Sequence, residues 1–105
     1  MKLSKDVYYW IIHPIKITIM LQEKMKKLKQ KMEEQQRLIN TIRNEINYNE
    51  DIFFYEENVD TNIVMKTLES LEIILREEKL ILLDIFIKYA ISKSRLKKII
   101  YRMNI

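Results

Sequence analysis

The chain has 105 residues, of which 48% are hydrophobic and 32% are charged, and it carries a formal net charge of +4. This length and composition predict one folded helical domain spanning residues 1–105 and argue against disorder. Cysteine is absent, which excludes a disulfide framework, a thiolate zinc site and a cysteine nucleophile, and favours a cytoplasmic location.

Glycine is also absent, which excludes the phosphate-binding loop, the dinucleotide fingerprint and the nucleophile elbow. The chain has 19 Ile, 14 Lys and 7 Asn but only one Ala and one Pro. Because the abundant residues use AT-rich codons, an AT-rich genome explains much of the glycine deficit. The remaining inference is that no turn depends on the left-handed backbone that glycine adopts easily.

The first half of the chain predicts a long helix over residues 14–47. Before it, the apolar residues 7–12 can form a short strand or a helical turn, and Pro14 suits a first helical turn because its missing N–H needs no partner there. Within the helix, seven apolar residues and one polar residue recur at alternating spacings of four and three, which places them on one stripe. The stripe consists of Leu21, Met25, Leu28, Met32, Gln35, Ile39, Ile42 and Ile46.

A dense lysine block lies within this helix, at residues 24–31. It is typical of a solvated helix face, and its alternative is a contact with phosphates or an acidic partner. The net charge of residues 1–50 is +4, that of 51–91 is −5 and that of 92–105 is +5. This alternation favours intramolecular or head-to-tail association over parallel self-pairing.

The connection expected over residues 48–60 is polar, acidic and aromatic. We predict a protein-binding site at its aromatic and acidic centre, because aromatic residues framed by charges are typical of protein interfaces. The alternative is that the aromatic side chains pack beneath the loop and close the end of the bundle. The predicted site consists of Ile52, Phe53, Phe54, Tyr55, Glu56 and Glu57.

A second long helix is expected over residues 61–90, with Asp60, Thr61 or Asn62 as its N-terminal cap. Its stripe has the same alternating spacing as the first. The stripe consists of Val64, Leu68, Leu71, Leu75, Glu78, Leu82, Ile85 and Tyr89.

The two stripes mirror each other about residue 55, which predicts a long antiparallel helical hairpin resembling a coiled coil. In this register Ile46 faces Val64, and Gln35 and Glu78 lie within one helical turn of each other. Lys24 would approach Lys88, a like-charge pair that opposes the pairing. Because residues 80–91 are apolar on all sides, the hairpin needs completion as a small bundle or by dimerisation, so we expect a homo-oligomer.

A short basic helix is expected over residues 92–103, and the junction before it resembles a helix-turn-helix. In that motif a small residue, an apolar residue and a capping Ser form the turn, and Ala90, Ile91 and Ser92 match these places. The resemblance covers about twenty residues, has Phe86 where a small residue is usual, and implies DNA or RNA binding. The alternative is an amphipathic helix that closes the bundle. The residues that would bind nucleic acid are Lys93, Ser94, Arg95, Lys97, Lys98 and Arg102.

No residue pattern indicates catalysis, a metal or a cofactor. His13 has no acidic neighbour at a metal-binding helical spacing, and adjacent carboxylates such as Glu33 and Glu34 point to different sides of a helix. Residues 47–58 imitate a calcium loop but have Ile52 where glycine is needed. The apolar run 80–91 contains two charges and is too short to span a bilayer, so no membrane partner is expected.

These patterns predict an all-helical, non-enzymatic protein. We expect a small regulator or inhibitor that acts by binding another macromolecule, first of all a protein. The alternative is a DNA-binding regulator that uses the basic C-terminal residues.

Overall fold

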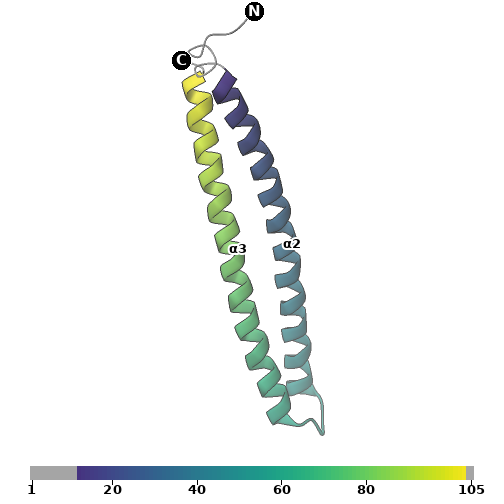
Figure 1. Ribbon diagram of the computed structural model, residues 1–105. Helices are drawn as coiled ribbons and strands as arrows, with labels where there is room; N and C mark the ends of the chain where they lie inside the picture. Colours follow the sequence, from purple (N-terminus) through teal and green to yellow (C-terminus); the bar gives the residue numbers. More distant parts are fainter. Residues whose placement is uncertain (1–11, 104–105) are drawn as a thin grey trace, which may run out of the picture. The chain divides into compact units, whose positions relative to one another are not determined.

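The computed structural model describes residues 12–103, and these residues contain two long helices and no strand. Helix α2 comprises His13–Tyr55 and helix α3 comprises Thr61–Met103, with a short loop between them (Figure 1). The all-helical prediction is confirmed for this part of the chain. Helix α2 continues eight residues beyond the predicted end at residue 47, so the connection is limited to residues 56–60. The interpretation of residues 7–11 as a strand or turn lies outside the described residues.

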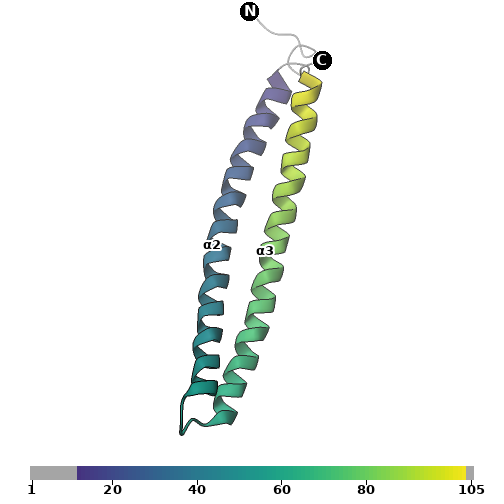
Figure 2. The same cartoon turned by 180° about the vertical axis from the view of Figure 1, so that it is seen from behind.

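The chain divides into two compact units. Unit 1 combines Met1–Lys31 with Ile85–Ile105, and unit 2 is Met32–Asp84. Within each unit, a segment of α2 lies beside an antiparallel segment of α3 (Figures 1 and 2). Each unit therefore contains a pair of antiparallel helical segments, one from α2 and one from α3.

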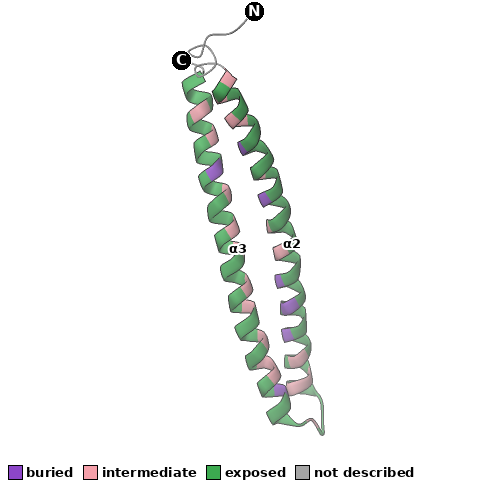
Figure 3. Ribbon diagram, viewed as in Figure 1, coloured by how far each residue is buried: buried purple, intermediate pink, exposed green. Residues whose placement is uncertain are grey.

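The predicted stripes form the inner faces of both helices. In α2 the buried apolar residues are Leu21, Leu28, Ile39, Ile42 and Ile46, all of them stripe positions. Figure 3 shows that buried and half-buried residues follow one side of each helix while the rest is exposed. The alternating spacing of four and three keeps successive apolar side chains on that side, which explains why the helices pair there.

A polar layer in unit 2 determines how α2 and α3 are aligned there. The Gln35 side-chain amide donates a hydrogen bond to the main-chain oxygen of Glu78 at 3.0 Å and another to the Glu78 carboxylate. The two polar stripe residues therefore face each other directly. This alignment differs by about one stripe step from the predicted mirror about residue 55, and the loop likewise lies beyond residue 55, at residues 56–60.

Starting from this pair, the alternating spacing gives the other facing positions. We infer that Ile39 faces Leu75, Ile42 faces Leu71 and Ile46 faces Leu68. The predicted pairing of Ile46 with Val64 differs from this inferred alignment by four residues of α3, which is about 6 Å along the helix.

Helix α3 continues without interruption through the position at which a separate C-terminal helix was expected to begin. Residues 92–103 are the last part of α3, so the predicted boundary at Ser92 is wrong. Ser92 follows Tyr89 by three residues, which is the next step of the same stripe, and its side chain is only 2% exposed. A small residue facing the other helix replaces the predicted helix cap, while Ile91 is 54% exposed.

The loop contains one residue in the left-handed region, contrary to the expectation for a chain without glycine. Asn58 has φ of 61°, and Asn tolerates this conformation better than other residues that carry a Cβ. Asp60 then caps α3 as predicted: its Oδ1 accepts hydrogen bonds from the backbone N–H of Asn62 at 3.0 Å and of Ile63 at 3.4 Å.

Pairing two helices leaves much of α3 uncovered. On this helix only Val64 and Ser92 are buried, and large apolar side chains remain exposed on its other sides, among them Leu80 at 62% and Phe86 at 58%. The sequence-based prediction that this helix is too apolar for a single neighbour agrees with these exposures.

Candidate interaction surfaces

The predicted aromatic site lies at the end of α2 in unit 2. Ile52 and Phe53 are half-buried, whereas Phe54 is 71% exposed and Tyr55 is 82% exposed. The rings of Phe53 and Phe54 meet edge to face with centroids 5.2 Å apart. The predicted residues therefore divide: two contribute to the helix pair, and two present aromatic surface to solvent.

Acidic residues flank these exposed rings in the sequence. Glu56 and Glu57 belong to the loop and are exposed, and the backbone N–H of Glu56 donates to the Ile52 carbonyl at 3.1 Å, which extends the last turn of α2. Glu50, Asp51 and Asp60 are exposed nearby in the sequence. We call Phe54, Tyr55, Glu56 and Glu57 the aromatic tip.

The predicted nucleic-acid-binding residues are all exposed residues of α3. Because α3 is continuous from residue 61 to 103, no turn exists at Ala90–Ser92, and the helix-turn-helix arrangement is absent from the described residues. The six side chains also separate into two faces. Arg95, Lys98 and Arg102 lie toward α2, while Lys93, Ser94 and Lys97 do not line the same groove.

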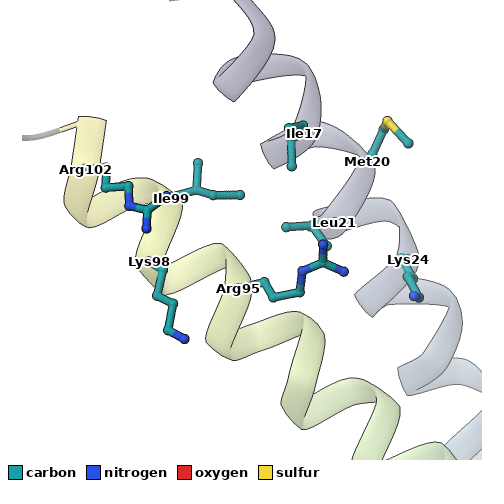
Figure 4. A pocket seen from close by; sticks show the side chains of 8 residues that line it. All are labelled: Ile17, Met20, Leu21, Lys24, Arg95, Lys98, Ile99 and Arg102. Atoms are coloured by element: carbon teal, nitrogen blue, oxygen red, sulfur yellow. The ribbon is translucent and has the colours of Figure 1, made fainter. Parts of the chain in front are cut away.

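The first face forms a groove of about 570 Å³ in unit 1, bordered by both helices. Figure 4 shows Ile99 of α3 and Leu21 of α2 pointing toward each other in the groove, with the Arg95 guanidinium extending toward α2. The groove has an apolar floor and a cationic border. The floor consists of Ile17, Met20, Leu21 and Ile99, and the border consists of Lys24, Arg95, Lys98 and Arg102.

A second groove of about 510 Å³ adjoins the first and shares Met20 and Lys24 with it. It adds Lys27 and Lys31 from the lysine block of α2, and both Lys24 and Lys88 border it. We call the cations of both grooves the basic surface: Lys24, Lys27, Lys31, Lys88, Arg95, Lys98 and Arg102.

The two units carry opposite charge. Among the described residues of unit 1, Glu23 is the single acidic residue, against twelve Lys and Arg. Unit 2 contains thirteen Asp and Glu against five Lys and Arg. The sequence shows three charge blocks, but the antiparallel pairing joins the first and last of them into one strongly basic unit.

Other chemistry has no assembled site among the described residues. No group of three His, Asp or Glu side chains within residues 12–103 is placed to hold a metal ion. His13 is the first residue of α2 and is exposed. Over the same residues, neither helix is long and apolar enough to cross a membrane.

Comparison with known proteins does not assign this architecture to a family. No family, no curated protein and no solved structure matches the chain.

Proposed function

We propose that this protein is a non-enzymatic helical regulator or inhibitor that acts by binding another protein through the aromatic tip. The observation that supports this proposal is the exposure of Phe54 and Tyr55 at the end of an otherwise acidic unit. Tyrosine and other aromatic residues are enriched among the residues that dominate binding energy, because a rigid ring buries a large area at a small entropic cost.

The edge-to-face contact with Phe53 strengthens the case for Phe54. A half-buried neighbour restricts the orientation of the Phe54 ring, so less conformational freedom is lost when a partner covers it. Tyr55 adds a hydroxyl that can donate a hydrogen bond at the border of the same contact.

The surrounding carboxylates define the chemistry of the partner. With Glu50, Asp51, Glu56, Glu57 and Asp60 around two aromatic rings, the complementary surface is an apolar pocket with a basic border. A protein that binds polyanions has such a surface, and an acidic aromatic tip that occupied it would act as an inhibitor.

The double variant Phe54→Ala/Tyr55→Ala tests the tip. Partners are captured from the native host by the full chain, identified by mass spectrometry, purified, and titrated against each variant. We expect the double variant to weaken binding of the purified partner roughly 30-fold or more, because truncation of a dominant interface residue costs about 2 kcal/mol or more.

The matched control is Phe86→Ala/Tyr101→Ala, which removes one exposed Phe and one exposed Tyr from unit 1. The control should bind the partner like the unmodified protein. Equal loss in both variants, or no loss in the tip variant at unchanged helicity, would contradict the proposal.

Two further expectations belong to this proposal. We propose a cytoplasmic setting, supported by the absence of cysteine, and self-association, supported by the exposed apolar side chains of α3. A second copy would complete the small bundle that the sequence predicts.

A further inference from the structure

The cations of the basic surface are arranged in two matching rows. On α2 they are Lys24, Lys27 and Lys31, and on α3 they are Arg95, Lys98 and Arg102, so both rows have spacings of three and four. Each row lies along one side of its helix. The α2 row borders the second groove and the α3 row borders the first, and Lys24 belongs to both grooves. The like charges gathered along these grooves repel one another, and an anionic occupant would relieve that repulsion.

The basic surface also has an apolar floor, which distinguishes among occupants. Met20 is 68% exposed, and Ile17, Leu21, Leu28 and Ile99 line the grooves, with no aromatic ring among the lining residues. Single-stranded nucleic acids bind on aromatic stacking platforms, whereas aliphatic side chains between cationic rows suit an amphipathic helix with acidic borders. The occupant that fits is therefore an acidic, apolar helical surface.

Unit 2 of the same chain carries a surface of that kind. The cations Lys24, Lys31 and Lys88 each come directly before a stripe residue, and Arg95 follows Lys88 by seven residues, which is the same helical position. At the equivalent positions of unit 2 the residues are Leu38 and Glu45 on α2, and Ile74 and Ile81 on α3.

These apolar residues are exposed, with Leu38 at 43%, Ile74 at 43% and Ile81 at 46%. Three exposed carboxylates belong to the same helix faces, since Glu34 precedes Leu38 by four residues, Glu45 follows it by seven, and Glu77 lies between the two isoleucines. We call Glu34, Leu38, Glu45, Ile74, Glu77 and Ile81 the acidic surface.

We propose that the basic surface of one copy binds the acidic surface of a second copy. Apolar side chains meet in the middle of this contact, and opposite charges meet at its borders. In the proposed dimer each copy contributes both surfaces, so the contact forms twice. This inference deepens the self-association proposed above and does not depend on the partner of the aromatic tip.

Charge reversal tests the pairing. The variant Lys24→Glu/Lys31→Glu/Arg95→Glu makes the basic surface acidic, and Glu34→Lys/Glu45→Lys/Glu77→Lys makes the acidic surface basic. Sedimentation velocity of the full chain at low salt should give a dimer of the 12.9 kDa protein, and each variant alone should dissociate roughly 100-fold more readily, because like charges then oppose each other.

Mixing the two variants provides the decisive measurement. In the mixed pair every reversed surface again meets an opposite charge, so an equal mixture should restore a dimer with one copy of each variant. This recovery could not come from variants that had merely unfolded, and circular dichroism measures the helicity of each variant alone.

The matched control is Lys26→Glu/Lys29→Glu/Lys93→Glu, which makes the same change in charge at exposed positions outside both grooves. It should dimerise like the unmodified protein. The proposal is overturned if this control loses the dimer equally, if the mixture stays monomeric, or if the unmodified protein is monomeric at low salt.

Binding of a DNA or RNA duplex to the unmodified monomer, abolished by reversal of the basic surface, would assign the grooves to nucleic acid instead. The tip variant Phe54→Ala/Tyr55→Ala should remain dimeric, so failure of one proposal is distinguishable from failure of the other.

Discussion

Asn58 and Ser92 show how the place of a single residue in the fold decides its role. Asn58 lies in the loop between the two helices, and Ser92 lies inside α3. Asn58 accepts a positive φ in a chain without glycine, and Asp60 caps α3 two residues later. Ser was read as a helix cap at position 92, a role in which its hydroxyl would bind free backbone N–H groups. Inside a continuous helix those groups are already bonded, so the same residue instead provides a small side chain at a buried stripe position.

Substitution of Asn58 tests the importance of the left-handed loop residue. We expect Asn58→Ala to lower the free energy of unfolding by roughly 0.5 to 1 kcal/mol, because alanine adopts positive φ less readily than asparagine. Asn58→Gly should cause no such loss. Chemical denaturation of both variants at one fixed protein concentration measures the difference, and equal stability of the Ala and Gly variants would contradict the assignment.

At the scale of the helices, the polar layer of Gln35 and Glu78 explains the alignment in unit 2. An apolar stripe with alternating spacings of three and four fits its partner almost equally well after a shift of one step, because leucine, isoleucine and methionine differ little in size. A polar residue shifted to an apolar neighbour loses its hydrogen bonds, so a polar pair can select one alignment at some cost in stability. The hydrogen bonds between Gln35 and Glu78 provide this selection.

Engineered cysteines distinguish the two alignments, and the chain has no native cysteine to interfere. Oxidation should crosslink Ile46→Cys/Leu68→Cys rapidly within one chain. A mirror about residue 55 would instead bring together Ile46→Cys/Val64→Cys. We expect this pair to form its disulfide at least about 10-fold more slowly, because a disulfide needs its two Cα atoms within about 7 Å. Electrophoresis without reductant separates the crosslinked monomer from chains joined to each other. Faster reaction of the 46 and 64 pair would show that the mirror alignment is correct.

At the scale of the whole molecule, charge is separated between two units with few fully buried residues. A strongly basic unit 1 and a strongly acidic unit 2 each contain internal repulsion, which opposite charge from a second copy would reduce. The exposed apolar residues of both surfaces add a contribution that salt does not screen.

This combination predicts how thermal stability depends on protein concentration. If folded copies associate and unfolded chains do not, the melting temperature rises with protein concentration. We expect that rise at low salt and a smaller one at high salt, measured by circular dichroism over a hundredfold concentration range. The variant Lys24→Glu/Lys31→Glu/Arg95→Glu should show no rise, and a melting temperature independent of concentration in the unmodified protein would contradict self-association.

The sequence alone determined the helical class, the inner stripes and the apolar excess of residues 80–91, because helical periodicity is a local property of the chain. It could not determine the end of α2, since residues 48–55 mix aromatic, acidic and amide side chains without a strong stop signal. In the sequence, the lysine block and the basic C-terminal residues belong to separate segments, and nothing in either segment indicates that they lie close together. Only the antiparallel pairing joined them into one basic surface. Contacts between distant segments depend on the length of the loop and on the polar pair that aligns the helices. Neither of these can be deduced from the stripes themselves.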